Sequence, residues 1–159
     1  MLSMQIGVIS DTHGLLRPEA VDALKGSELI IHAGDVGAPE ILEALRRIAP
    51  VVAVRGNVDT APWARTLPLT EVVEAGGSLL YVLHQVDHLD LDPGSAGFAA
   101  VICGHSHKPS AEIRRGVLFL NPGSAGPRRF SLPVTLVRLR LAGTSLEPEF
   151  VSLETARDA

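Results

Sequence analysis

The first third of the chain alternates short apolar runs with segments of helical spacing. Apolar runs at 4–9, 29–33 and 51–54 predict buried strands, and each ends at a polar, turn-like segment. The segment 17–25 has a proline near its start and a glycine just past its end, which predicts a helix. Residues 39–48 carry apolar side chains at intervals of three and four, which predicts a second helix. This order predicts parallel strands joined by right-handed crossovers.

Beyond residue 65 the pattern is that of strands. A glycine pair separates two runs that predict a hairpin, a buried strand follows, and two further pairs of strands complete the chain. The predicted strands cover 69–74, 78–83, 99–103, 111–115, 117–120, 134–141 and 146–153. Since no long linker separates the two halves, we expect a single α/β domain over residues 1–153 and a frayed tail over 154–159.

Composition narrows the class of protein. A chain of 159 residues with 46% hydrophobic and 20% charged residues can bury a core without disulfides, and its single cysteine, Cys103, excludes a cysteine-type zinc site. The net charge of −4 and the scattered arginines exclude a dedicated nucleic-acid surface. The N-terminus lacks the pattern of a leader peptide, and no apolar run reaches the roughly 20 residues of a membrane span. We therefore expect a cytoplasmic protein.

The residues with catalytic chemistry stand where predicted strands end. Five strand ends supply seven potential metal ligands: Asp11, His13, Asp35, Asn57, His84, His105 and His107. Ligand sites in α/β sheets lie beyond the carboxyl ends of the strands, so these side chains could share one crevice. In extended backbone, the two outer residues of Asp-x-His or His-x-His point the same way and could bind one metal jointly.

Each motif also has a simpler interpretation. A single Asp-x-His is more often a turn than a metal site, and Gly34-Asp35 and Gly56-Asn57 are ordinary turn dipeptides. The occurrence of all five motifs at strand ends and in this order, four of them beside a glycine, favours the metal site. We interpret His32 as a residue at the edge of the core and His88 as a surface residue.

The ordered motifs Asp-x-His, Gly-Asp, Gly-Asn, a single His and Gly-His-x-His resemble the signature of calcineurin-like metallophosphoesterases. The stretches 56–59 (Gly-Asn-Val-Asp) and 121–124 (Asn-Pro-Gly-Ser) resemble its small bacterial and archaeal phosphodiesterase branch, which also includes the retromer scaffold subunit. The resemblance extends from residue 6 to about residue 141. It implies a four-layer α-β-β-α sandwich with two mixed β-sheets.

The same resemblance implies a dinuclear metal centre. One ion is expected on Asp11, His13 and His107, the other on Asn57, His84 and His105, with Asp35 bridging the two. Two ions about 3.5–4 Å apart can hold a bridging hydroxide for in-line attack on phosphorus. Imidazole and carboxylate ligands without thiolate suit Mn, our first choice, or Ni, Zn, Fe or Co.

Two departures from the family pattern concern catalysis. Larger members have a histidine in the third motif that protonates the leaving group, whereas this chain has Val58-Asp59. Asn57 and Asp59 are therefore the candidate catalytic residues, Asp59 as an acid or base, although capping of a turn is an equal alternative for Asp59. Gln85 replaces the glycine that usually follows the fourth-motif histidine, which makes Gln85 and Asn57 candidate substrate contacts. The segment 86–98 is shorter than the helix-bearing segment usual there.

The expected function is hydrolysis of a small-molecule phosphoester, with phosphodiesters favoured by the resemblance. A phosphomonoesterase or nucleotidase is an alternative, because the same two metals support it. A third alternative is a scaffold or interaction module on the same fold, with or without metal. Trp63 is a candidate contact in a homo-oligomer.

Overall fold

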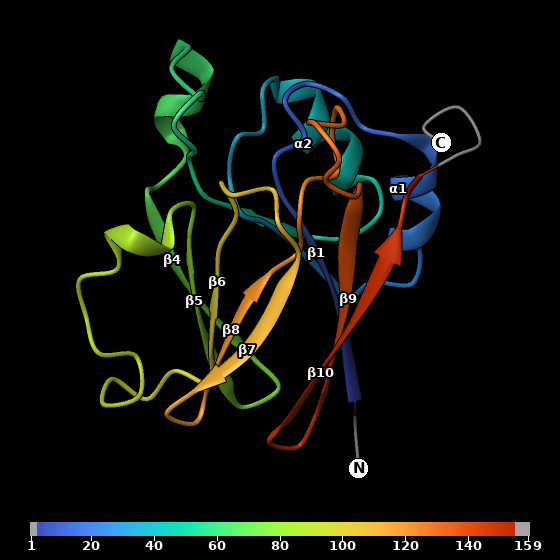
Figure 1. Ribbon diagram of the computed structural model, residues 1–159. Coiled ribbons are helices and arrows are strands. Elements are labelled where there is room, and N and C mark those ends of the chain that lie inside the picture. Colours follow the sequence, from blue (N-terminus) through green and yellow to red (C-terminus); the bar gives the residue numbers. More distant parts are fainter. Residues whose placement is uncertain (1–2, 155–159) are drawn as a thin grey trace.

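The computed structural model describes residues 3–154 and contains two five-stranded mixed sheets packed face to face (Figure 1). The first sheet has the order β10-β9-β1-β2-β3 and the second β4-β5-β6-β8-β7. The strands are β1 (Ser3–Ile9), β2 (Leu29–His32), β3 (Val51–Ala53), β4 (Thr70–Ala75), β5 (Ser78–Leu83), β6 (Ala100–Ile102), β7 (Ser110–Arg114), β8 (Val117–Asn121), β9 (Thr135–Ala142) and β10 (Ser145–Ser152). The helices are α1 (Pro18–Leu24), α2 (Pro39–Arg46) and two 3₁₀ turns, η1 (Pro62–Thr66) and η2 (Val86–His88).

The first sheet follows the β-α-β-α-β order expected from the sequence. β1 pairs in parallel with β2, and β2 with β3, so their carboxyl ends meet at one edge. Pro18 and Pro39 open the two helices, where a missing N–H breaks no intrahelical bond. The antiparallel strand β9 pairs with β1 on the other side and extends the sheet to β10. The predicted parallel arrangement is confirmed.

The second sheet brings two more motif-bearing strand ends to the same region. β4 and β5 form the expected hairpin, while β5, β6 and β8 run parallel to one another and β7 pairs antiparallel with β8. The fold class expected from the resemblance, α/β with two mixed sheets, is confirmed. In the second sheet, the parallel strands β5 and β6 are followed directly by the histidine motifs of residues 84 and 104–107.

The apolar core lies in three layers because strand side chains alternate between faces. Leu80 and Val82 of β5 point inward and meet Ile6 and Val8 of β1 between the sheets. A second cluster lies between the first sheet and its helices, where Leu45 is fully buried. Burying each large aliphatic side chain contributes about 1.5–3 kcal/mol, so this packing fixes the sheets that carry the motifs.

Residues 86–98 cover the outer face of the second sheet. All of this segment is described by the structure, and it contains the 3₁₀ turn η2 but no α-helix. Leu89, Leu91 and Phe98 pack on this face, and the Phe98 ring meets Tyr81 edge to face at 5.1 Å. The short covering segment agrees with the short stretch noted in the sequence. The fourth layer is therefore thin, and space is left beside β5.

Trp63 lies in η1 and is partly buried against the apolar cluster beneath the helices. Part of its ring therefore contributes to the core of its own chain. A role for the exposed part in an oligomer stays a prediction.

The ends of the described chain add two details. Glu154 accepts a hydrogen bond from Val134 N at 3.3 Å, whereas the rest of the predicted frayed tail, 155–159, lies outside the described residues. Among residues 3–154, none of the helices has the length and apolar character that a membrane crossing requires.

Candidate metal centre

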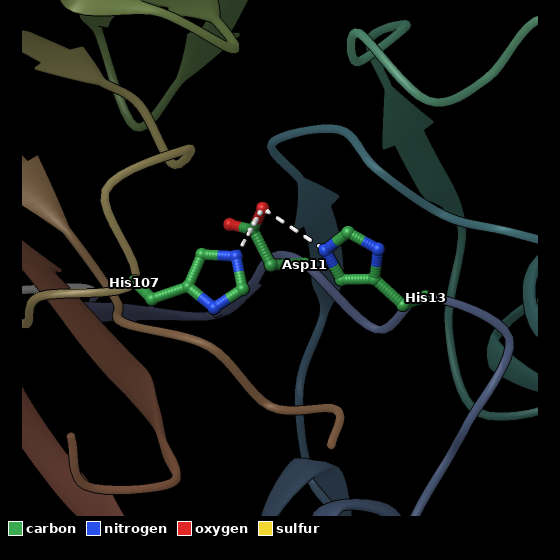
Figure 2. A group of neighbouring side chains, drawn as sticks. All are labelled: Asp11, His13 and His107. Atoms are coloured by element: carbon green, nitrogen blue, oxygen red, sulfur yellow. Dashed lines mark ion pairs between the residues drawn. The ribbon is translucent and has the colours of Figure 1, made fainter. Parts of the chain in front are cut away.

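One group of candidate ligands surrounds the carboxylate of Asp11, just beyond β1. Its Oδ1 lies 3.3 Å from Nε2 of His107 and 3.7 Å from Nε2 of His13 (Figure 2). Figure 2 shows the two imidazoles approaching this carboxylate from opposite sides, one from the β6–β7 connection and one from the loop after β1. The group matches the first ligand set that the resemblance implies.

A second group surrounds the carboxylate of Asp35, beyond β2. Nε2 of His84 lies 3.2 Å from Asp35 Oδ2, and His105 completes a set whose donor atoms lie within 4.8 Å of one another. Asn57 Oδ1 lies 3.0 Å from Nε2 of His84 and 3.1 Å from Nδ1 of His105. The structure thus brings Asn57 into the second set as well.

The two groups adjoin one another. Nε2 of His13 lies 3.6 Å from Asp35 Oδ2, and Nε2 of His84 lies 3.8 Å from Asp11 Oδ1. Asp35 therefore lies between both sets of imidazoles, the position expected of a bridging ligand. All seven residues singled out in the sequence meet in one place.

The expected extended geometry of the Asp-x-His and His-x-His pairs is wrong. Five of the seven side chains leave a backbone with positive φ: Asp11 (56°), His13 (46°), Asp35 (55°), His105 (72°) and His107 (63°). Left-handed backbone costs non-glycine residues of order 1–3 kcal/mol each. The side chains converge because the chain turns sharply at these five residues, so the surrounding structure must hold the turns in place.

Main-chain hydrogen bonds hold two of these turns together. Asp11 N donates to Gly34 O at 3.0 Å, His13 N to Asp35 O at 3.0 Å and Gly14 N to Val36 O at 2.9 Å. These three hydrogen bonds connect the loop after β1 to the loop after β2. These bonds offset the cost of the strained backbone.

His32 is the residue that sequence reasoning misjudged. It is fully buried rather than at the core edge, and burial lowers the pKa of its imidazole to about 4. Its Nδ1 accepts from Gly34 N at 3.1 Å, so Nε2 carries the proton and donates to Thr12 Oγ1 at 3.0 Å. Thr12 Oγ1 in turn donates to Val36 O at 2.8 Å. The signal in the sequence was a histidine closing an apolar strand directly before Gly34-Asp35.

Asp59 holds the other side of the Asp35 loop. Its side chain is 4% exposed, and its two oxygens accept three main-chain hydrogen bonds, from Val36 at 3.2 Å, Gly37 at 3.0 Å and Gly56 at 2.9 Å. Of the two roles left open by the sequence, this geometry supports turn capping and gives no support to acid–base catalysis. The carboxylate ties the Asn57 loop to the Asp35 loop.

Gln85 lies against a ligand. Its Nε2 donates to Nε2 of His105 at 3.1 Å, and Nδ1 of His105 then donates to Asn57 Oδ1. Because Gln85, His105 and Asn57 are partly or fully exposed, this edge of the centre faces solvent. The opposite edge, at Asp11 and His107, is buried.

Two glycines make the close approach of ligands possible. A Cβ on Gly56 would lie 2.1 Å from both the main-chain N and Oδ1 of Asp35, and one on Gly34 would lie 2.6 Å from Nδ1 of His84. Any side chain at either position would displace a ligand.

The Asn-Pro-Gly-Ser stretch at residues 121–124 forms hydrogen bonds to two neighbouring loops. Asn121 Nδ2 donates to Gly104 O at 2.9 Å, and Ser124 Oγ donates to Asp11 O at 3.1 Å. It anchors the loops that carry Asp11 and His105 without supplying a ligand.

The arrangement fits divalent metal ions. Asp11 Oδ1 and His13 Nε2 are buried and have no hydrogen-bond partner, although they face one another at the centre. Buried polar atoms without a partner are rare, and an ion between them would satisfy both. Nδ1 of His84 donates to Ala33 O at 2.7 Å, which turns the Nε2 lone pair toward the centre, as in many metal-ligating histidines.

The charges also suit a cation. Burial would raise the pKa of both carboxyls, but the imidazoles of His107 and His13 hold the pKa of Asp11 well below its usual range, and His84 does so for Asp35. Both are therefore carboxylates at neutral pH. Burial opposes charge on His84, yet Asp35 and Asp11 outweigh it and raise its pKa. Cys103 belongs to neither group of donor atoms, and burial raises the pKa of its thiol to about 11.

Known proteins resemble this chain in sequence and in fold. The calcineurin-like phosphoesterase superfamily domain matches residues 4–144. A probable metallophosphoesterase of Methanothermobacter thermautotrophicus is 37% identical over 93% of this chain and 92% of its own length.

Solved structures of other proteins have the same fold as this chain. A conserved uncharacterised protein of Streptococcus pneumoniae, described as a predicted phosphoesterase, superposes with a TM-score of 0.76 at 26% identity over 96% of this chain and 91% of the other. An archaeal phosphodiesterase superposes with a TM-score of 0.76 at 24% identity over 94% of this chain and 100% of the other, which shows a shared fold. The domain match, the relative and the seven assembled ligands lead to one conclusion: the chain belongs to the calcineurin-like phosphoesterase superfamily.

Proposed function

We propose that this protein is a metal-dependent phosphodiesterase with a dinuclear centre. The observation that carries the proposal is the pair of adjoining ligand groups, with buried donor atoms of Asp11 and His13 left without a hydrogen-bond partner. Asp11, His13 and His107 would hold one ion, and Asn57, His84 and His105 the other, with Asp35 shared. Mn is our first choice of metal and Ni, Zn, Fe and Co are the alternatives, because a mixed imidazole and oxygen set without thiolate suits all of them.

When bound, two such ions supply Lewis acidity and a nucleophilic water at neutral pH. The chain's own residues orient the reactants. Asn57 and Gln85 lie on the solvent-facing edge of the centre, where their amide groups can hydrogen-bond phosphate oxygens. This position supports a catalytic role for Asn57 and substrate contacts for Asn57 and Gln85, whereas Asp59 is proposed as a positioning residue.

Diester hydrolysis is preferred to monoester hydrolysis on the likeness to the archaeal phosphodiesterase. The scaffold alternative is disfavoured, because all seven candidate ligands are present in this chain. A small-molecule phosphoester is the proposed substrate, and cytoplasmic location stays a prediction.

The test is hydrolysis of an aryl phosphodiester and the matching aryl monoester by protein loaded with Mn. We expect turnover of the diester to exceed that of the monoester, and the Asp11→Asn substitution to abolish both, because it removes the central charge of the first group. Asp22→Asn, which alters an exposed carboxylate paired with Lys25, is the matched control. Absence of turnover in metal-loaded wild type would refute the enzyme assignment, and equal loss in the control would refute the site.

A further inference from the structure

A cavity of about 460 Å³ opens directly beside the second ligand group. Asn57, His84 and Gln85 are among its lining residues, so whatever is bound at the centre would border it. Its volume falls within the roughly 300–1,000 Å³ usual for small-molecule sites. The cavity runs along β5, where residues 86–98 cover the second sheet without an α-helix.

The cavity has an apolar wall. Tyr81 and Leu83 of β5 and Leu69, which is 62% exposed, contribute to it. An exposed leucine beside a cavity and next to a catalytic centre suits contact with the organic part of a ligand. These apolar side chains do not by themselves discriminate between anionic, cationic and neutral ligands.

Arg55 gives the cavity its charge. It precedes the ligand Asn57 by two residues and is the one arginine or lysine among the lining residues. The Nε atom of Arg55 is buried and has no hydrogen-bond partner. The guanidinium of Arg55 forms no ion pair with any of the residues 3–154 that the structure describes. A buried guanidinium N–H without an acceptor is costly unless a ligand supplies one.

Other ionisable groups line the same cavity. Asp90 and His88 are exposed, and Asp90 forms no ion pair with Arg55. Water screens the charge of the exposed Asp90 carboxylate more strongly than that of the partly buried Arg55 guanidinium, so Arg55 has the stronger effect on an anion in the cavity. An anion there would receive charge-assisted, geometrically fixed hydrogen bonds.

We propose that this cavity, with Arg55 as its anion contact, binds the organic arm of the substrate and selects phosphodiesters whose arm carries a second anionic group, a carboxylate or a phosphate. This inference rests on the proposed phosphodiesterase function. It assigns Arg55 to substrate specificity and the apolar wall to the carbon chain that links the two anionic groups.

The test compares p-nitrophenyl alkyl phosphodiesters that share one leaving group. Their second arm ends in a methyl group, a carboxylate, a phosphate or an ammonium group. We expect kcat/KM for the carboxylate and phosphate arms to exceed that for the methyl arm by roughly 10- to 100-fold, the value of a charged hydrogen bond. In Arg55→Gln this ratio should fall toward one, in Arg55→Lys it should be intermediate, and in the exposed control Arg46→Gln it should persist.

A second readout does not depend on turnover. Non-hydrolysable phosphonates with methyl and carboxylate arms should show the same difference in Kd by calorimetry. Equal kcat/KM for methyl and anionic arms, or preference for the ammonium arm, would overturn the inference while leaving the phosphodiesterase assignment intact. Failure of wild type to hydrolyse any arm would instead refute the proposed function.

Discussion

Replacement of Asp59 by asparagine separates its two proposed roles. In the structure, Oδ2 accepts from Val36 N and Gly56 N, and Oδ1 accepts from Gly37 N. Asparagine has one acceptor oxygen, so at least one main-chain N–H would face an NH₂ group. The side chain is 4% exposed, so water cannot replace the lost acceptor.

The magnitude follows from these bonds. Hydrogen bonds to a charged group contribute about 1.5–3 kcal/mol and neutral ones about 0.5–1.5 kcal/mol. Loss of one charged bond costs about 1.5–3 kcal/mol and conversion of the other two to neutral bonds costs about 1–1.5 kcal/mol each, so the free energy of unfolding should decrease by about 3.5–6 kcal/mol. Because Asp59 holds the loops of Asp35 and Asn57 together, metal affinity should fall about 10- to 100-fold, as for other residues that support metal ligands.

Urea unfolding of the metal-free protein and calorimetric titration with Mn measure the two effects. Asp22→Asn serves as control, since Asp22 is exposed and its ion pair with Lys25 is accessible to water. If Asp59→Asn keeps wild-type stability and metal affinity but loses one limb of the pH–rate profile, the positioning role is wrong and Asp59 acts as an acid or base.

Three further predictions concern other residues. The pKa of buried His32 is about 4 instead of 6.5, so below pH 6.5 the unfolded chain binds a proton that the folded chain excludes until about pH 4. The free energy of unfolding of the metal-free protein should therefore fall by about 3 kcal/mol as the pH drops through this window. The His32→Gln variant should lack this fall, and a fall of the same size in the variant would contradict the prediction. Gly56→Ala should displace Asp35 and abolish binding of one Mn ion in calorimetry, whereas Gly94→Ala, with no atom within 3.4 Å of its Cβ, should bind normally. Cys103, 6% exposed with a pKa raised to about 11, should resist iodoacetamide in the folded state, and fast labelling followed by mass spectrometry would contradict its burial.

Much of the fold was accessible from the sequence because its signals are local. Apolar runs, prolines at helix starts and glycine turns depend on short stretches, so the strands, both α-helices and the hairpins were predicted within a few residues. The candidate ligands could be picked out because each of them follows the end of a strand within a few residues. The turns η1 and η2 were missed, since single 3₁₀ turns have no apolar period to reveal them.

The rest depends on contacts between distant segments. The positive φ of Asp11 and Asp35 arises because their two loops are hydrogen-bonded to each other, which a reading of either motif alone cannot reveal. The roles of His32 and Asp59 likewise follow from partners that are 20 to 23 residues away in the sequence. The cavity at Arg55 is formed by four separate segments and leaves no trace in any one of them.

The most direct test of the central claim is the metal content of the protein after loading with Mn, measured by inductively coupled plasma mass spectrometry. We predict two ions per chain in wild type. His13→Ala and His105→Ala should each lose one of them, because these partly or fully exposed histidines belong to different groups and can be truncated without opening the core. Fewer than two ions in wild type, or two ions retained in both variants, would contradict the dinuclear centre.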